Sequence, residues 1–460
     1  MNKIIKGKCI DISSEGKGVV KFGRDIVFCD GLFPGEEADI EILYQRAGVY
    51  FGKVRKLYTL SKDRIQPKCK ICTACGGCQY QQINYQKQLE YKTNRVKNAV
   101  TRIAHLNVEV KPCIGAKHPY NYRNKIQVPF AKDRKGNVVY GFYKENSHEI
   151  IPTKECMIED KRAASILWDI KELIKEFNIP VYNEDNGKGI LRYVLIRTSY
   201  HYPELMVVLV TSIMNFPGQR NFIDALLKKH PEITTIVENV NSRHTNVILG
   251  NKEKVLYGPG FIKDKICDLT FEISASSFFQ INPEQVEVLY KTALSLIDIK
   301  KEQVVLDAYS GVGTIGLIAS KNAKKVISVE IVKDAHRNAI ENAKRNGISN
   351  IEFHCGDAGE FINSYDSDLD IVIMDPPRKG SDEKFLSTLI NKKVPQIIYV
   401  SCDPETLARD LEYLSSHYKV DYVQPVDMFP QTAHCETVVS LSIANHSDEI
   451  LQITPTKYCK

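Results

Sequence analysis

The sequence predicts an α/β protein whose C-terminal part is a doubly wound parallel sheet. From about residue 270, short apolar segments alternate with helical patterns, the order that builds a parallel sheet covered by helices on both faces. Polar residues follow four consecutive predicted strands there, at the sheet edge where α/β proteins place their ligands. Because 460 residues are too many for one hydrophobic core, we expect further domains before this sheet.

Two regions with different patterns precede the parallel sheet. The first consists of short apolar segments separated by Gly and Pro roughly every 8–12 residues, which is typical of a small β-barrel. The second combines alternating strands with helical patterns at 84–103, 161–177 and 218–230, which predicts a mixed α+β domain. The predicted regions are a barrel at 1–60, a mixed domain at 61–268, the parallel sheet domain at 269–446 and a tail at 447–460.

The composition argues against secretion and against membrane insertion. Hydrophobic residues make up 43% and charged residues 26% of the chain, as in an ordinary globular protein. No run of about 18 apolar residues is present, and the first residues lack the apolar core of a signal peptide. The 13 cysteines, an odd number, fit a reducing compartment better than a disulfide framework. We expect a cytoplasmic protein without membrane contact.

Positive charge is concentrated in one segment. Residues 61–135 hold sixteen Lys and Arg against four Asp and Glu, whereas residues 136–460 hold thirty-six against forty-four. Aromatic residues are interleaved with the basic ones, namely Tyr80, Tyr85, Tyr91, Tyr120, Tyr122 and Phe130. Cations pair with phosphates and rings stack on bases, so the segment favours single-stranded nucleic acid as a partner. A solvated lysine-rich surface is the alternative interpretation.

A glycine-rich turn followed by acidic strand ends forms a candidate nucleotide site. Gly311 and Gly313 follow an apolar strand and let the backbone approach a ligand closely. The next strand ends at Glu330, where an acidic group would hold ribose hydroxyls. These features alone also fit a dehydrogenase. Two further strands end at Asp357 and at Asp375, and the Asp-Pro-Pro at the latter resembles S-adenosylmethionine-dependent methyltransferases.

A cysteine follows the next predicted strand. The segment IIYVSCDPETLARDL, from Ile397, is an apolar strand that stops near Cys402 and continues as a helix. The thiol is therefore expected at a helix N-terminus, which lowers a cysteine pKa and favours the nucleophilic thiolate. A buried core cysteine is the alternative.

Five motifs together resemble a known enzyme family. SFFQINPEQ, DAYSGVG, DPPRKG, SCDPETLARDL and HCETVVSL occur in the order and spacing of the bacterial uracil-C5 RNA methyltransferases. The resemblance covers nearly the whole chain and is closest to the 23S ribosomal RNA (uracil-5-)-methyltransferases. It implies a C-terminal Rossmann-like S-adenosylmethionine domain and an N-terminal OB-like, RNA-binding TRAM barrel.

The resemblance also implies the catalytic groups. Cys402 is expected to add to C6 of uracil, because C5 is not nucleophilic enough to accept a methyl group unaided. Glu436 is expected to remove the C5 proton afterwards. His434 is an alternative proton carrier, and Cys435 is expected to be inert.

The methyl-donor site follows from the same motifs. The family pattern falls on Gln280, Tyr309, Glu330 and Asp375, with Asp357 near the adenine. Thr314 stands where the family has an Asn contact, so its role is open. Arg378 is expected either to reach a substrate phosphate or to form a surface salt bridge.

A cysteine-rich patch, CKICTACGGC, precedes the basic helix. Read alone, the spacing of Cys69, Cys72, Cys75 and Cys78 predicts an iron–sulfur site, with zinc or free thiols as alternatives. The family pattern instead selects Cys69, Cys75 and Cys78 with the distant Cys156 as ligands of a [4Fe-4S] cluster. Cys72 and Cys156 thus compete for the fourth position.

The predicted function is methylation of a uridine in 23S ribosomal RNA by a monomeric enzyme. Ribosomal RNA is preferred because the tRNA-directed branch generally lacks both barrel and cluster. The alternatives are tRNA uracil-C5 methylation, RNA cytosine-C5 methylation, methylation of an exocyclic amine, and a non-catalytic iron–sulfur scaffold that binds RNA.

Overall fold

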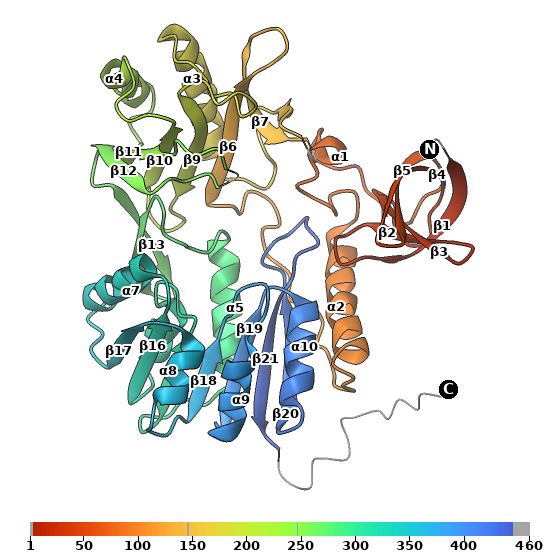
Figure 1. Ribbon diagram of the computed structural model, residues 1–460, viewed down its shortest axis with the longest axis vertical. Coiled ribbons are helices and arrows are strands. Elements are labelled where there is room, and N and C mark those ends of the chain that lie inside the picture. The colour runs from red at the N-terminus through yellow and green to blue at the C-terminus, as the bar shows by residue number, and fades with distance from the viewer. Residues whose placement is uncertain (1–2, 145–146, 246, 445–460) are drawn as a thin grey trace.

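A computed structural model describes residues 3–144, 147–245 and 247–444 (Figure 1). The predicted tail, 447–460, lies outside these residues. None of the helices in the described segments is long and apolar enough to cross a membrane. Figure 1 shows the N-terminal barrel set to one side, the central sheet above, and the C-terminal sheet with its helices below.

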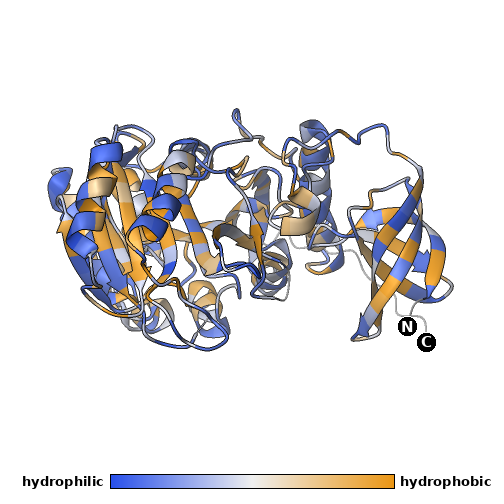
Figure 2. Cartoon of the chain, turned by 90° about the horizontal axis from the view of Figure 1, so that it is seen from above, coloured by the Kyte–Doolittle hydropathy of each residue, from blue (hydrophilic) through white to orange (hydrophobic). Residues whose placement is uncertain are grey.

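The N-terminal strands close into a five-stranded barrel, as the sequence predicts. The strand order is β1-β2-β3-β5-β4, with β1 also paired to β4. Buried residues alternate with more exposed ones along the strands, so Val20, Val27 and Ile40 fill the interior. Figure 2 shows hydrophobic and hydrophilic residues interspersed along the barrel strands. The strands are β1 (Ile4–Ile12), β2 (Gly18–Phe22), β3 (Asp25–Asp30), β4 (Glu37–Arg46) and β5 (Val49–Thr59).

The central region is built on a mixed seven-stranded sheet in the order β12-β11-β10-β9-β6-β7-β8. Helices α3 (Arg162–Glu176) and α4 (Gln219–Lys229) cover one face, as expected for a mixed α+β domain. The sequence did not indicate the edge strands β8 and β12, which are short or largely exposed. The strands are β6 (Lys125–Lys132), β7 (Val138–Tyr143), β8 (Ile150–Pro152), β9 (Leu191–Thr198), β10 (Leu205–Thr211), β11 (Thr235–Val240) and β12 (Lys252–Tyr257).

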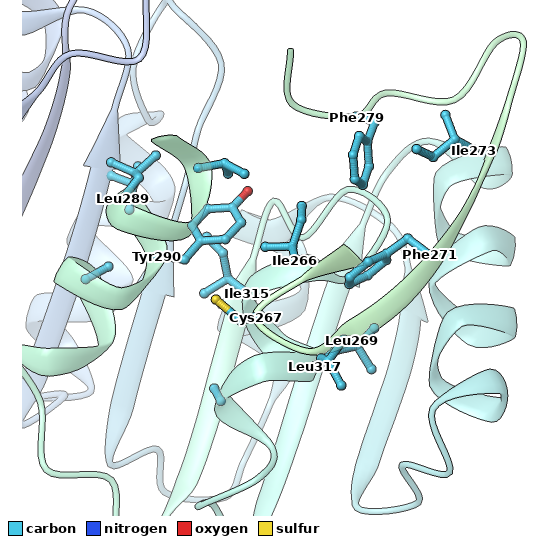
Figure 3. Packing of buried hydrophobic residues seen from close by; sticks show 14 of the residues in the cluster. Ile266, Cys267, Leu269, Phe271, Ile273, Phe279, Leu289, Tyr290, Ile315 and Leu317 are labelled. Carbon is cyan, nitrogen blue, oxygen red and sulfur yellow. The ribbon is translucent and has the colours of Figure 1, made fainter. Parts of the chain in front are cut away.

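A hairpin joins the central and C-terminal sheets. Strands β13 (Phe261–Ile266) and β14 (Leu269–Ser274) are connected by Cys267 and Asp268, whose φ angles of 49° and 66° suit a tight two-residue turn. The predicted boundary after residue 268 therefore falls inside a compact hairpin. Buried side chains of β10 and of this hairpin pack in the same hydrophobic core as the C-terminal strands (Figure 3).

The C-terminal sheet has the order β17-β16-β15-β18-β19-β21-β20, in which β21 runs antiparallel to both of its neighbours and the other strands run parallel to one another. Alternate residues of each central strand serve two cores, as Val305 and Leu306 illustrate, so both faces are buried. The strands are β15 (Val304–Ala308), β16 (Lys325–Glu330), β17 (Ile351–Cys355), β18 (Ile371–Met374), β19 (Gln396–Ser401), β20 (Tyr418–Val426) and β21 (Glu436–Ile443).

Helices cover both faces of this sheet, which confirms the doubly wound arrangement. One face packs against α5 (Pro283–Ser295), α6 (Thr314–Ala319) and α7 (Lys333–Arg345). The other packs against α8 (Ala358–Ser364), α9 (Glu383–Asn391) and α10 (Pro404–Leu414).

The basic helix α2 (Tyr85–Arg102) packs on the C-terminal sheet, although the sequence placed it in the central region. Val96, Ala99 and Val100 are buried in the same core as α10 and β20. The chain after α2 then bridges to β20, where Val110 pairs with Val423. The short helix α1 (Cys72–Cys75) precedes α2.

Candidate active site

The carboxyl ends of the parallel strands meet at one edge of the C-terminal sheet. Ala308 pairs with Val329 on one side and with Met374 on the other. Tyr309, Glu330 and Asp375, each one residue further along, are therefore neighbours. The strand ends that the sequence suggested as a binding site thus come together as expected for an α/β ligand site.

The glycine-rich turn is tied to Glu330 by hydrogen bonds. The Gly311 N–H donates to Glu330 Oε2 at 2.7 Å, and the Val332 N–H donates to Oε1 at 2.7 Å. Tyr309 adopts a φ of 62°, unusual for a residue with a side chain, and its hydroxyl lies 2.9 Å from Ser381 Oγ. These contacts fix the turn that would approach a nucleotide.

The structure explains why position 316 is a glycine, which the spacing of the motif did not. Its N–H donates to Asp307 Oδ2 at 2.9 Å, and a Cβ at this position would lie 2.6 Å from the same oxygen. Burial, Asp375 and Glu330 raise the pKa of the Asp307 carboxyl to about 8, although the Gly316 N–H opposes the shift. The first turn of α6 is thus anchored to the end of β15.

A cavity of about 990 Å³ opens at this edge. Its walls include Tyr309, Glu330, Asp357 and Asp375, four of the five residues expected to bind the methyl donor. Asp357 also caps α8 by accepting a hydrogen bond from the Glu360 N–H at 3.0 Å. The size and the convergent polar groups suit a nucleoside-sized ligand.

The fifth residue, Gln280, does not line the cavity but contacts Tyr290 beneath it. Tyr290, on α5, is buried, and its hydroxyl points away from Cys267 in Figure 3. Gln280 lies in hydrogen-bonding contact with this hydroxyl, and burial, with smaller effects of the Asp375 and Glu436 charges, raises the pKa of the phenol. Tyr290 therefore lies close to both acids. Nothing in the sequence singles out Tyr290, because an aromatic residue on an apolar helix face gives no separate signal.

Cys402 and Glu436 are brought together by the antiparallel pairing of β19 and β21. Ser401 pairs with Thr437. Cys402 follows Ser401 and Glu436 precedes Thr437, so Cys402 and Glu436 lie opposite each other. Cys402 is half-buried and Glu436 is only 6% exposed. The nucleophile and base expected from the sequence thus share the edge that holds Asp375.

The structure contradicts the expected pKa of Cys402. Burial, Glu436 and Asp375 raise the pKa of this thiol to about 11, whereas the sequence predicted a lowered value from the helix N-terminus. Cys402 precedes Asp403, whose side chain caps α10 by accepting the Thr406 N–H at 3.0 Å. Two nearby carboxyl groups therefore oppose thiolate formation.

Arg378 is the cation that counters these carboxyl groups. Its charge lowers the pKa of Cys402 and that of Glu436, whose pKa is nevertheless raised well above its ordinary value by burial and by Asp375. Burial and Arg378 also lower the pKa of His434, which favours its neutral imidazole. Arg378 thus acts within the site, while its side chain remains exposed to solvent.

Comparison with known proteins identifies the family. Residues 84–444 match the family model described as tRNA (uracil-5-)-methyltransferase. The chain belongs to this family. An uncharacterised RNA methyltransferase from Halalkalibacterium halodurans is 41% identical over 96% of this chain and 98% of its own length. One from Staphylococcus aureus is 39% identical, with the same coverage of both chains.

A solved structure extends the comparison to the bound methyl-donor product. The tRNA (uracil-54, C5)-methyltransferase of Pyrococcus abyssi, in complex with S-adenosyl-L-homocysteine, is 29% identical with a TM-score of 0.77. The match covers 95% of this chain and 99% of that one. The protein is therefore an S-adenosylmethionine-dependent RNA (uracil-C5) methyltransferase, as the sequence resemblance implied.

In this methyltransferase, residues of α2 hold the loop that leads to Glu436. Lys92 and Asp427 form an ion pair with fully buried side chains, and the Tyr85 hydroxyl donates to Asp427 at 2.8 Å. Gln88 Nε2 donates to Gln431 Oε1 at 3.1 Å. The loop between β20 and Glu436 is thus positioned by polar groups that sequence spacing could not connect.

The cysteine-rich segment contacts the same loop. The Ala433 N–H donates to Gln79 Oε1 at 3.2 Å, and the Tyr80 N–H donates to the Gln431 carbonyl at 2.9 Å. Cys435, expected to be inert, is buried and hydrogen-bonded to Cys113, which lowers the pKa of Cys435. The segment that carries the cysteines is therefore adjacent to the loop that leads to Glu436.

The predicted cluster cysteines lie near one another and are half-buried. Burial raises the pKa of Cys72, Cys75, Cys78 and Cys156; Cys69 adds to the shift of the first three, and Cys78 adds to that of Cys156. Four thiols suit iron–sulfur chemistry as a donor set. However, no three His, Cys, Asp or Glu side chains among the described residues are arranged to hold a metal ion. The donor set fits a cluster, but the thiols as placed do not form its site.

Proposed function

We propose that the protein methylates C5 of a uridine in RNA through a covalent bond between Cys402 and C6 of the base. The observation that carries the proposal is the position of Cys402 opposite Glu436, at the edge that also bounds the donor cavity. Asp375 connects the two regions, because it lines the cavity and its charge acts on both residues.

The chemistry requires a nucleophile and a base in this order. The Cys402 thiolate forms a bond to C6, and the electrons of the C5–C6 double bond move into an enolate whose C5 is nucleophilic. S-adenosylmethionine supplies an electrophilic methyl group, which C5 takes while S-adenosylhomocysteine leaves. Glu436 then removes the C5 proton, the double bond re-forms, and the bond from C6 to Cys402 breaks to return the thiolate.

The electrostatics of the site suit Glu436 for this step. Burial and Asp375 raise the pKa of its carboxyl well above the ordinary value. A carboxylate with a raised pKa is a stronger base, and general bases work best with a pKa near the operating pH. The same environment disfavours the free Cys402 thiolate, so Arg378 and the bound uracil ring must support its formation.

We propose 23S ribosomal RNA as the substrate, because the five motifs most resemble the ribosomal RNA branch. tRNA is the second candidate, favoured by the similarity to the tRNA (uracil-54, C5)-methyltransferase of Pyrococcus abyssi. The uncovered 5% of this chain is shorter than the barrel, Ile4–Thr59, so that tRNA enzyme has a counterpart for most of the barrel. The barrel therefore does not separate the two substrates, contrary to our expectation from the sequence.

Modified nucleosides from cells with and without the gene test this proposal. Ribosomal RNA and tRNA are separated, digested and analysed by mass spectrometry. We expect ribothymidine to disappear from one fragment of 23S RNA, and a plasmid encoding Cys402→Ala to fail to restore it. Loss from tRNA instead would select the second candidate. Loss of 5-methylcytidine, or no change in either RNA, would contradict the function.

We further propose that Cys69, Cys75, Cys78 and Cys156 hold a [4Fe-4S] cluster after local rearrangement. The donor set and the closeness of these thiols support it. Anaerobically purified protein should contain iron and acid-labile sulfide in cluster stoichiometry. Retention in Cys72→Ser with loss in Cys156→Ser would assign the fourth ligand, and iron-free wild-type protein would refute the cluster. A cytoplasmic location and a monomeric state also stay predictions from the sequence.

A further inference from the structure

The loop that leads to Glu436 is held at its ends by the sheet and along its length by other elements. It comprises residues 427–435, and we call it the catalytic loop. Its ends are fixed because Val426 pairs with Glu436. The sheet pairing does not fix the residues between these ends. At Ala433, which is 4% exposed, the catalytic loop contacts the N-terminal barrel, the cysteine-rich segment and α2.

A turn of the N-terminal barrel lies directly against Ala433. The turn at 13–17 joins β1 to β2 and is closed by a hydrogen bond from the Gly16 N–H to the Ser13 carbonyl at 2.9 Å. Gly16 is buried, and a Cβ at its position would lie 3.0 Å from the Ala433 Cβ and 2.8 Å from the Gln79 Cβ. Gln79 is itself bound to the catalytic loop, because its Oε1 accepts the Ala433 N–H. Non-bonded carbon atoms prefer a separation of about 3.5–4.0 Å, so a side chain at position 16 must displace the loop or Gln79.

A buried interface fixes the barrel in this position. The Glu36 side chain, 0% exposed, pairs with Arg64 at 2.6 Å, and Arg64 Nη1 donates to Gln82 Oε1 at 2.7 Å. The barrel also shares a hydrophobic cluster with the catalytic loop, the cysteine-rich segment and α2, whose members are Ile12, Phe33, Tyr80, Ile83, Tyr91 and Ala433. Closely packed interiors transmit strain, so a change at Gly16 reaches Ala433 instead of moving the whole barrel.

Arg95 of α2 connects Ala433 to the helix that follows Cys402. Its Nη1 donates to the Ala433 carbonyl at 3.0 Å, and its Nε and Nη2 donate to the Glu405 carboxylate at 3.1 and 2.6 Å. Glu405 lies in the first turn of α10. A guanidinium holds its N–H groups in a rigid fork, so a shift of Ala433 strains or breaks these hydrogen bonds. Ala433 and Glu405 are each three residues from a group of the proposed reaction, Glu436 and Cys402 respectively.

We propose that the N-terminal barrel is a positioning element for methyl transfer, and that Gly16, Ala433 and Arg95 carry this role. The sheet fixes the backbones of the nucleophile and the base, while the barrel and Arg95 fix the loop and the helix that adjoin them. The described residues that line the donor cavity all lie between 250 and 382, so changes in the barrel should leave binding of the methyl donor unaltered. This inference rests on the proposed function and gives a positioning role to a domain outside the site.

Two alanine substitutions at barrel glycines test this role. Gly16→Ala places a methyl group against Ala433, and the matched control is Gly48→Ala, in the exposed turn between β4 and β5. The φ angles are 78° and 80°, so both changes impose the same backbone strain. At Gly48, however, no atom beyond its chain neighbours lies within 4 Å of the Cβ position. A loss of activity through backbone strain or stability alone would therefore appear in both variants.

The substrate is the RNA fragment that contains the mapped methylation site, assayed below the thermal midpoints of all variants. We expect Gly16→Ala to lower kcat about tenfold with little change in KM for the RNA, because a small misplacement of reacting groups is costly. Its Kd for S-adenosylhomocysteine should equal that of the wild type. Gly48→Ala should retain the wild-type kcat. A wild-type kcat in Gly16→Ala, or an equal loss in Gly48→Ala, would refute the positioning role.

Arg95→Met tests the same route without a change in the barrel. It removes the bridge between Ala433 and Glu405 and should also lower kcat, whereas Arg102→Met, at an exposed position of the same helix, should not. In the double variant Gly16→Ala/Arg95→Met the two losses should not multiply, because both act on the position of Ala433. Losses that multiply would refute the route through Arg95.

Failure of this inference is distinguishable from failure of the proposed function. If Gly16→Ala does not fold, an unchanged kcat in Arg95→Met refutes the positioning role by itself. Methyl transfer by the wild type that neither substitution affects would overturn this inference alone, whereas no methyl transfer by wild-type protein would overturn the proposed function.

Discussion

Cys402 and Glu436 face each other across the pairing of β19 and β21, directly beyond the pair formed by Ser401 and Thr437. Both residues are therefore fixed by strands of one sheet rather than by separate loops. Each is acidic, and the Glu436 charge raises the pKa of the Cys402 thiol. The ionised carboxylate of Glu436 is more stable once the Cys402 sulfur is bonded to carbon and carries no charge. Glu436 is therefore best able to accept a proton after the thiol has reacted.

The reactivity of Cys402 in the free enzyme should increase steeply with pH. Its pKa is raised to about 11, and only the thiolate reacts, so alkylation by iodoacetamide should rise about tenfold per pH unit between roughly pH 7 and 10. Arg378→Gln should slow the reaction at fixed pH, and Glu436→Gln should speed it. Peptide mass spectrometry gives the rates, with the exposed Cys355 as internal control. A rate that levels off below pH 8 would contradict the raised pKa.

Replacement of the base should stop the reaction after methyl transfer. In Glu436→Gln the C5 proton stays in place, so the bond from Cys402 to C6 cannot break. We expect turnover to fall by roughly 10²–10⁴-fold and a methylated RNA–protein adduct to accumulate on denaturing gels. Glu412→Gln, at an exposed position of α10, should behave as wild type. Normal turnover by Glu436→Gln would remove this residue from its role.

The acidic end of β16 should contribute to binding of the methyl donor. Glu330→Gln keeps the shape of the side chain but removes its charge, so the affinity for S-adenosylhomocysteine should fall about tenfold, near 1.4 kcal/mol. Isothermal titration calorimetry measures it. Glu352→Gln, at an exposed position of β17, provides the control. Gln can accept only one of the two backbone N–H bonds that Glu330 accepts from Gly311 and Val332, so an unchanged Kd would contradict any contribution of this carboxylate to donor binding.

The buried pair under the catalytic loop should matter for stability. Lys92→Met leaves Asp427 charged and buried, which should lower the free energy of unfolding by about 3–5 kcal/mol in urea titrations. The double variant Lys92→Met/Asp427→Leu should recover much of this loss. Lys97→Met, exposed on the same helix, should be nearly neutral. A double variant less stable than the single one would show that the ion pair itself is strongly stabilising.

The parts that the sequence predicted are those with local signals. The barrel follows from alternating residues between Gly and Pro, and the strand ends at Glu330 and Asp375 share an edge because parallel strands must. The pKa of Cys402 could not be predicted in this way. The helix that follows Cys402 predicts a lowered pKa. The charges that raise this pKa instead belong to Asp375, which follows β18, and to Glu436, at the start of β21.

Contacts between segments that are far apart in the sequence could not be predicted from local patterns either. The basic helix α2 looked like part of an RNA-binding region, yet its apolar face lies on the C-terminal core and its Lys92 supports the catalytic loop. Tyr290 is placed beside Gln280 and Asp375 only by the fold of α5 against the sheet. Tertiary contacts of this kind leave no periodic pattern of residues in the sequence.

The central claim is the transient bond between Cys402 and C6 of uracil, and trapping tests it most directly. The mapped RNA fragment is synthesised with 5-fluorouridine at the target position, and the protein is incubated with it and S-adenosylmethionine. Fluorine cannot leave as a cation, so we predict that wild-type protein forms a stable complex containing the RNA and one transferred methyl group, linked through Cys402. Cys402→Ala should form none. Methylation of the unsubstituted RNA with no trapped complex would contradict the account.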